Sequence, residues 1–286
     1  MGSNNIFKNR TAVLITKHKK EEVIFPVLEP MEMNLKLLDS IDTDTFGTFT
    51  RDIDRTGTQL EAARYKALKA IEATGESIAI ASEGSFGAHP AMYFVPANVE
   101  LILLIDTLNN IEILGWEISA DTNHSHSEVS SFKEAQIFAK QSGFPSHGLV
   151  VRPNTGGNNS DILFKGITCE KILKVAVMKS ISASQDGKAL IETDMRALYN
   201  PTRIKVIEKA AFNLLHKIQN FCPECGWPAF EITEWIKGLP CKRCFSLTKG
   251  VVKHIYLCKK CKHKEEIEYP NNQNYSDPCF CDYCNP

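Results

Sequence analysis

Four short cysteine motifs decide the architecture of the end of the chain: CPEC at residues 222–225, CKRC at 241–244, CKKC at 258–261 and CDYC at 281–284. Each C-x-x-C motif places two thiolates on one tight turn, and a structural zinc ion takes four such ligands in a tetrahedron. The sequence therefore predicts a zinc-ribbon-like module over residues 221–286 with two sites of four cysteines each. The expected ligands of the two structural Zn²⁺ ions are Cys222, Cys225, Cys241, Cys244, Cys258, Cys261, Cys281 and Cys284.

The spacing of the motifs favours one of two pairings. Fifteen residues separate the first motif from the second, and nineteen separate the third from the fourth. These spacings are typical of zinc ribbons, so we expect the first motif to pair with the second and the third with the fourth. A cross-braced module, with the first paired to the third and the second to the fourth, is the alternative. Of the other cysteines, Cys169 is expected to be buried and Cys279 to be a spare thiol.

Composition restricts the class of protein and its partners. The chain has 286 residues, a net charge of -1 and 43 % hydrophobic residues, which is typical of a globular protein. Such a balance creates no long-range field for nucleic acid or an anionic membrane, so neither is an expected partner. The apolar run at residues 11–16 is too short for a secretory signal. We expect a cytoplasmic protein with a flexible tail at residues 1–10, in which reduced thiols bind metal.

Residues 11–220 carry the pattern of an α/β domain. Apolar, β-branched runs alternate with segments of helical periodicity, and two of the runs are joined by Asn109-Asn110 as a hairpin. This order predicts a mixed sheet with flanking helices. The expected strands are 11–16, 34–38, 77–81, 99–105, 111–118, 147–152, 162–167 and 189–192, and the expected helices are 19–29, 58–74, 132–141, 170–180 and 202–219.

Polar side chains follow the expected strands at points where α/β proteins bind ligands. Lys17, His18 and Lys20 come directly after the first strand, where a helix N-terminus favours an anion. Ser82 and Glu83 follow the strand that ends at Ala81, at the carboxyl edge of the sheet. These residues predict a site for a phosphorylated ligand.

Carboxylates from separate segments could share a magnesium ion in this site. Glu61, Glu83 and Asp194 are the candidate catalytic residues, because Mg²⁺ takes oxygen ligands and bridges to substrate phosphate. Lys66 and Arg196 join the candidate substrate-binding residues as cations. His124 and His126 suggest a further alternative, a catalytic zinc ion, which requires a third ligand that the sequence does not indicate.

The chain resembles an uncharacterised bacterial family known as domain of unknown function 6671. The resemblance covers nearly the whole chain and implies no activity. It rests on ITKH (15–18), DTDTFGTF (42–49), QLEAARYKA (59–67), ASEGSFGAHP (81–90), TNHSH (122–126), GLVVRP (148–153), ETDMRALYNPTR (192–203) and the four cysteine motifs ending in CDYCNP.

The order of elements is also similar to the inosine-triphosphate-pyrophosphatase-like fold, whose members hydrolyse noncanonical nucleoside triphosphates with Mg²⁺. By this resemblance Lys17 and Lys20 would hold phosphate, Glu61 and Glu83 would hold Mg²⁺ or orient water, and Lys66 would offset charge. The sequence departs from that family at His18 and Ala62, where the family usually has Asn.

Two functions follow as hypotheses. The first is a Mg²⁺-dependent hydrolase that acts on a phosphorylated, nucleotide-like small molecule and carries a structural zinc module. The second is a non-enzymatic adaptor whose zinc module binds a protein or RNA. Convergence of the carboxylates in one cleft would favour the enzyme, and their dispersal over the surface would favour the adaptor.

Overall fold

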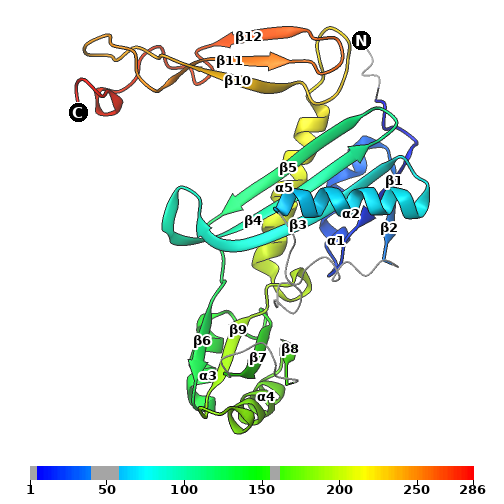
Figure 1. Cartoon of the computed structure of the whole chain (residues 1–286), viewed down its shortest axis with the longest axis vertical. Helices are drawn as coiled ribbons and strands as arrows, with labels where there is room; N and C mark the ends of the chain where they lie inside the picture. Colours follow the sequence, from blue (N-terminus) through cyan, green and yellow to red (C-terminus); the bar gives the residue numbers. More distant parts are fainter. Residues whose placement is uncertain (1–4, 40–57, 155–161) are drawn as a thin grey trace. The chain divides into compact units, whose positions relative to one another are not determined.

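The computed structural model describes residues 5–39, 58–154 and 162–286 (Figure 1). Contacts divide the chain into two compact units, of which the larger holds residues 7–215 and the smaller holds residues 216–286. The motif DTDTFGTF at residues 42–49 lies outside the described residues. No helix in the described ranges is long and apolar enough to cross a membrane.

A five-stranded mixed sheet forms the first half of the larger unit, which confirms the predicted fold class. Its strand order is β2-β1-β3-β4-β5, with parallel pairing between β1 and its two neighbours and antiparallel pairing from β3 to β5. The strands and helices of this part are β1 (Thr11–Ile15), α1 (Glu21–Leu28), β2 (Asn34–Leu38), α2 (Gln59–Thr74), β3 (Ile78–His89), β4 (Met92–Asp106) and β5 (Ile111–Ser119).

Strand β3 is longer than the sequence predicts. It continues through the polar run 82–87 and stays paired with β4 as far as His89. Ser82 and Glu83 therefore lie within a strand, whereas the sequence predicts that they follow it. Parallel β1 ends at Ile15, opposite Ala81, while antiparallel β4 continues to supply hydrogen-bond partners to β3 beyond that point.

The two faces of this sheet carry different helices. Helix α2 packs alanines Ala63, Ala67 and Ala70 against Leu101, Leu103 and Ile105 of β4 and their neighbours. Helix α5 (Pro201–Gln219) approaches the opposite face at Gly115, where an added Cβ would lie 2.5 Å from the Ala210 carbonyl oxygen. Because side chains alternate along a strand, the even-numbered residues of β4 face α5.

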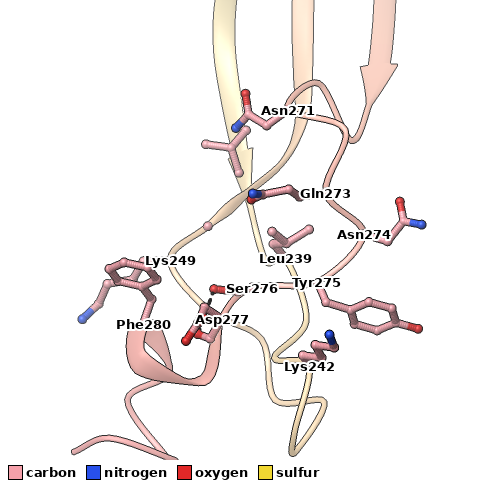
Figure 2. A pocket seen from close by; sticks show the side chains of 12 residues that line it. Leu239, Lys242, Lys249, Asn271, Gln273, Asn274, Tyr275, Ser276, Asp277 and Phe280 are labelled. Atoms are coloured by element: carbon pink, nitrogen blue, oxygen red, sulfur yellow. Dashed lines mark hydrogen bonds between the residues drawn. The ribbon is translucent and has the colours of Figure 1, made fainter.

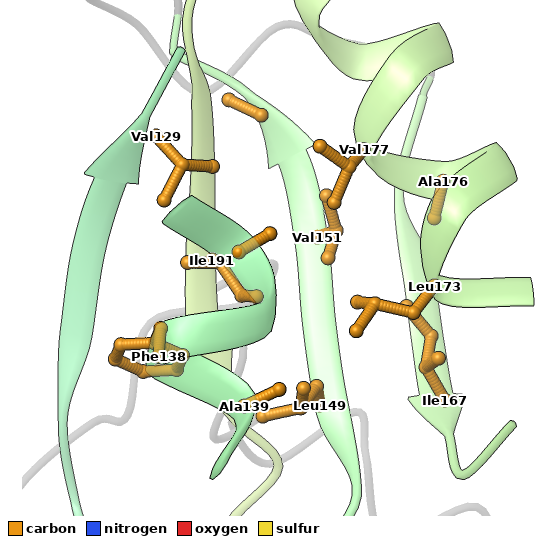
Figure 3. Packing of buried hydrophobic residues seen from close by; sticks show 12 residues of the cluster. Val129, Phe138, Ala139, Leu149, Val151, Ile167, Leu173, Ala176, Val177 and Ile191 are labelled. Carbon is orange, nitrogen blue, oxygen red and sulfur yellow. The ribbon is translucent and has the colours of Figure 1, made fainter. Parts of the chain in front are cut away.

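The strands beyond residue 120 form a sheet of their own. It is antiparallel, in the order β6-β9-β7-β8, and helices α3 and α4 pack their apolar side chains against it (Figure 3). The sequence predicted β7, β8, β9 and both helices but not β6, and it placed the predicted strands in one sheet with the others. Their bounds are β6 (His126–Val129), α3 (Phe132–Gln141), β7 (Leu149–Pro153), β8 (Phe164–Ile167), α4 (Glu170–Ala183) and β9 (Ala189–Thr193).

Two smaller expectations are wrong. The chain is packed before its first strand, because Phe7 is fully buried and Arg10 forms an ion pair with Asp106 at 2.6 Å. Residues 7–10 are therefore not a free tail. Cys169 is exposed at the start of α4 rather than buried, because it occupies the N-cap position of that helix.

The smaller unit contains a three-stranded antiparallel sheet in the order β10-β11-β12. Its strands are β10 (Glu231–Lys237), β11 (Val251–Leu257) and β12 (Lys264–Glu268). Phe230 is the one large apolar side chain of its buried cluster, beside Cys222 and Cys258, with Trp227 and Tyr256 packed against them. So small a core needs another source of stability.

Candidate functional site

The eight motif cysteines form two groups, and their pairing is cross-braced. Cys222, Cys225, Cys258 and Cys261 make one group, and Cys241, Cys244, Cys281 and Cys284 make the other. The sequential pairing expected from spacing is wrong.

The strands explain the pairing. Antiparallel β10 and β11 place Glu231 opposite Leu257, which brings the first and third motifs to one end of the sheet. The second motif follows β10 at the other end. Since a strand of seven residues spans roughly 20 Å, one ion cannot join motifs at both ends.

The sulfur positions fit one metal ion in each group. Tetrahedral zinc with bonds of about 2.3 Å places its ligand sulfurs about 3.8 Å apart. The Sγ–Sγ distances are 3.7 Å for Cys222 and Cys261 and 3.6 Å for Cys225 and Cys258. In the second group they are 3.9 Å for Cys241 and Cys284 and 3.6 Å for Cys244 and Cys281. Each group could therefore hold one tetrahedral ion.

All four motifs share one backbone turn. The amide four residues after the first cysteine donates to the carbonyl of that cysteine, at 2.9 Å from Gly226, 3.0 Å from Phe245, 3.1 Å from Lys262 and 2.9 Å from Asn285. The donor residue has a positive φ in three of them, at Gly226, Phe245 and Lys262. Hydrogen bonds from Ser246 also lower the pKa of Cys244 to about 6, which favours the thiolate.

A second constellation lies in the larger unit, beside the carboxyl end of β1. Lys20 directs its ammonium to the Ser82 hydroxyl at 3.2 Å, and both side chains are buried. Lys66 of α2 forms an ion pair with Glu83 on the next residue of β3. His18 and Lys19, in the turn that leads to Lys20, both adopt left-handed backbone conformations, with φ of 67° and 64°. This turn is costly for non-glycine residues and is held by the structure around it.

A buried ion pair between α5 and β4 completes the constellation. Arg203 Nε donates to Glu100 Oε1 at 2.7 Å, and neither side chain is exposed. Arg203 Nη1 also donates to the Met195 carbonyl at 2.5 Å. Gly84 is required beside the pair, because a Cβ there would lie 2.5 Å from Glu100 Oε1 and would also collide with the guanidinium. We call Lys20, Lys66, Ser82, Glu83, Glu100 and Arg203 the buried charge cluster.

The cluster contains more cationic than anionic groups. It brings the three cations Lys20, Lys66 and Arg203 together with the two carboxylates Glu83 and Glu100, and each of these residues is at most 9 % exposed. Burial, with Arg203 nearby, lowers the pKa of Lys20 to about 7, although Glu100 and Glu83 act in the opposite direction. A neutral Lys20 balances the cluster, and so does a bound anion beside a protonated Lys20.

The other predicted catalytic residues do not join the cluster. Glu61 is exposed and closes a capping box at the start of α2, where it accepts from the Thr58 amide at 2.7 Å. These hydrogen bonds lower the pKa of Glu61. Asp194 is buried, where it accepts from the Gly166 amide at 2.9 Å and from the Arg196 guanidinium at 2.6 Å. Arg196 also lies over the Tyr199 ring, so both residues hold the second sheet together.

The remaining predicted residues lie outside any further metal group. Lys17 and His18 are half-buried in the turn before α1. His124 stacks near Phe86, and His126 begins β6. Within the described ranges, the two four-cysteine groups are the only places where three or more His, Cys, Asp or Glu side chains could hold a metal. The described carboxylates and histidines therefore form no further group of three side chains of this kind.

The sequence patterns did not point to Glu100 and Arg203, although each residue left a signal. Glu100 is the single charge within the apolar run VELILLI at 99–105. Arg203 occupies the same stripe of α5 as Ile207, Ala210 and Leu214, all of which are fully buried. Two opposite charges at positions that otherwise carry apolar residues indicate a buried ion pair.

The smaller unit also contains an open pocket beside the second cysteine group. Its volume is about 760 Å³. Leu239 and Gln273 lie centrally, between Phe280 on one side and Tyr275 on the other (Figure 2). Phe280 is 75 % exposed and Tyr275 is 48 % exposed, and nearby Leu247 is 77 % exposed. This is an unusual density of exposed apolar side chains for so short a segment.

Comparison with protein families assigns the chain. Residues 66–286 match the family model described as Domain of unknown function (DUF6671). The chain belongs to the DUF6671 family. The match includes the four cysteine motifs, Ser82, Glu83 and Arg203, and it begins at Lys66. No curated protein matches this DUF6671 chain.

The cross-braced pairing in this DUF6671 protein predicts a specific loss of metal in double variants. Cys222→Ser with Cys258→Ser damages one site and should leave one equivalent of metal per chain. Cys222→Ser with Cys241→Ser damages both sites and should leave none. Elemental analysis of the purified proteins measures both values, with Cys169→Ser plus Cys279→Ser as the control that retains two. If Cys222→Ser with Cys258→Ser retained no metal and Cys222→Ser with Cys241→Ser retained one equivalent, the pairing would be sequential.

Burial of Lys20 predicts a pH dependence of stability. The folded-state pKa is about 7, whereas an unfolded lysine titrates near about 10.4. Between these values the unfolded chain binds more protons, so the free energy of unfolding should rise with pH, by at most about 1.4 kcal/mol per unit. Urea unfolding at pH 7 to 9 should show this slope, and Lys20→Met should remove it. Equal slopes in both proteins would contradict a buried, deprotonating Lys20.

Proposed function

We propose that the larger unit binds a phosphorylated, nucleotide-like small molecule at the buried charge cluster and hydrolyses one of its phosphate bonds. The observation that carries the proposal is the excess of cations: Lys20, Lys66 and Arg203 lie against two carboxylates in a part of the protein shielded from water. A phosphate group supplies the missing negative charge, and desolvated cations bind it more strongly than exposed ones.

The position of the cluster supports the same ligand. Parallel strands β1 and β2 end at Ile15 and Leu38, and Lys20 and Ser82 lie just beyond the end of β1. Ligands of α/β proteins bind outside the carboxyl ends of parallel strands. The sequence resemblance to the inosine-triphosphate-pyrophosphatase-like fold implies a nucleoside triphosphate as substrate, with Lys20 at the phosphates, Lys66 offsetting charge and Glu83 orienting water.

Glu83 is the carboxylate that fits the chemistry. Magnesium sites at phosphates commonly use one or two carboxylates, with the remaining ligands supplied by phosphate and water. Successive residues of a strand point to opposite faces, so Lys20 with Ser82 and Lys66 with Glu83 lie on the two faces of β3. Because β1 ends at Ile15, opposite Ala81, a phosphate just beyond that end would contact Lys20 from one face and Lys66 with Glu83 from the other. In the proposed reaction, Glu83 orients the attacking water. The lysines stabilise the negative charge that develops on the phosphoryl oxygens.

We assign Zn²⁺ to both cysteine groups and a structural role to it. Four thiolates at the distances of a single tetrahedral ion are the ligand set of structural zinc, and they leave no open coordination position. Retention of eight reduced thiolates agrees with a cytoplasmic location.

The hydrolase proposal is tested by a screen of nucleoside triphosphates with Mg²⁺, Mn²⁺ or Zn²⁺, followed by variants. Glu83→Gln should lower turnover at least about 100-fold, since it removes the group that orients water, and its fold should be checked by circular dichroism. Glu61→Gln is the matched control, because its carboxylate only caps α2, and it should keep its turnover. Wild-type turnover in folded Glu83→Gln, or equal loss in both variants, would remove Glu83 from the mechanism.

A second candidate function comes from the pocket near the second cysteine group. Exposed Tyr275 and Phe280 line this pocket together with Leu239, and such apolar side chains suit a protein partner. The smaller unit does not suit RNA by charge. From Cys222 onward it has nine basic and eight acidic side chains, and eight thiolates with two divalent ions add four negative charges. Its net charge is then -3, which disfavours phosphate backbones.

Selection of displayed peptides against the full chain tests this adaptor function. Enriched peptides should share an apolar residue, and calorimetry should show at least about 10-fold weaker binding to Phe280→Ala, as for an apolar anchor residue. Trp235→Ala, an exposed aromatic on β10, is the control and should bind normally. Failure to enrich any peptide, or binding of a single-stranded RNA oligonucleotide at this surface instead, would reject a protein-docking role.

A further inference from the structure

Asn98 is a buried amide with unmet hydrogen bonds. Its side chain is 1 % exposed, and neither its nitrogen nor its oxygen has a hydrogen-bond partner among the described residues. Buried polar groups are paired in the great majority of cases, because an unpaired amide forfeits its bonds to water. An unpaired group of this kind within a candidate site indicates a ligand that completes it.

Asn98 lies on the sheet face that carries Glu100 and Arg203. It is directly opposite Phe86 in the pairing of β3 with β4, and Glu100 is two residues further along the same strand. Residues two apart on a strand point to the same face. The Arg203 guanidinium, held by Glu100, lies 5.3 Å from the centre of the Phe86 ring. The amide, the ring and the guanidinium are thus neighbours.

The aromatic part of this group extends towards solvent. The rings of Phe86 and His124 have centroids 5.5 Å apart and planes 32° apart. Phe86 is half-buried and His124 is exposed. A ligand that approaches from the His124 side would meet an aromatic face first and the amide behind it.

A planar heterocycle suits these groups best. Aromatic side chains bind nucleobases by stacking, in a manner that tolerates every base. A side-chain amide both donates and accepts in one plane, which matches a base edge with an adjacent acceptor and donor. A purely anionic ligand would leave the carbonyl oxygen of Asn98 unpaired, and an aliphatic ligand would leave both amide atoms unpaired.

We propose that Asn98 recognises the nucleobase of the ligand, with both amide atoms hydrogen-bonded to one edge of the base and Phe86 beside its plane. The inference rests on the proposed function, because the phosphates of the same ligand would lie at Lys20, whose partner Ser82 is on the same face of β3 as Phe86. Asn98 thereby determines which phosphorylated molecule binds, and the lysines determine that a phosphorylated molecule binds at all.

Calorimetry with two probes tests whether Asn98 binds the base while the lysines bind the phosphates. One probe is a purine nucleoside triphosphate, taken in turn from ATP, GTP and ITP, and the other is inorganic tripolyphosphate, which carries no base. Both are titrated without divalent metal, so that no turnover occurs. Asn98→Leu should weaken binding of the preferred nucleotide about 10- to 100-fold, as expected for two lost hydrogen bonds. Binding of tripolyphosphate should stay unchanged.

The thermal stability of the ligand-free Asn98→Leu protein supplies a second readout. Asn98→Leu removes an unpaired buried amide and should leave the thermal midpoint unchanged or raise it. Asn98→Asp, which keeps an acceptor and loses the donor, should also weaken nucleotide binding. A lower midpoint in Asn98→Leu would show that the amide has a structural partner such as an ordered water, and would overturn the proposal. Unchanged nucleotide affinity in Asn98→Leu would also overturn the proposal.

The outcomes also separate this inference from the function on which it rests. If neither probe binds the wild-type chain, the phosphate site is wrong and the base site falls with it. If both probes bind with similar affinity, the phosphate site stands and the proposal for Asn98 is rejected. Lys20→Met should weaken both probes, which distinguishes loss of the phosphate site from loss of base recognition.

Discussion

The ion pair between Arg203 and Glu100 is the interaction on which the larger unit depends, because both charges are completely removed from water. Removing one partner of such a pair leaves an uncompensated buried charge, which commonly costs about 3–5 kcal/mol. The pair fixes the start of α5 against β4, and the Met195 carbonyl ties the same guanidinium to the segment that leaves the second sheet. The pair also explains the glycine at position 84 of β3, because any side chain there would collide with Arg203 and Glu100.

The same burial gives the neighbouring lysine its properties. Lys20 would be an ordinary cation on the surface, but next to Arg203 and away from water its pKa falls to about 7. Such a lysine responds to an anion, because a negative charge nearby restores its proton. In the proposed function, binding of the anion would therefore change the charge state of Lys20. In the smaller unit the apolar core is small, and the two groups of four cysteines could each hold a metal ion that would stabilise the fold.

Sequence patterns predicted the elements well and their long-range partners poorly. The helix at 58–74 and the hairpin around Asn109 were found because periodicity, caps and turn residues are local signals. The cysteine ligands were found for the same reason, whereas their pairing depends on the antiparallel course of β10 and β11. The capping box of Thr58 with Glu61 is also a local signal, and it gives Glu61 a place at the start of α2 that the sequence analysis did not include. The Glu100 and Arg203 partnership joins residues 103 positions apart, which no local pattern can show.

The buried charge cluster is, in this view, an anion-binding site, and its excess of cations is the reason. A crystal structure of the full chain grown with phosphate or vanadate tests this claim most directly. We expect electron density for an anion within hydrogen-bonding distance of the Lys20 ammonium, with Arg203 still bound to Glu100. Clear density for all six side chains of the cluster in their present arrangement, with no anion among them at saturating concentration, would contradict the claim.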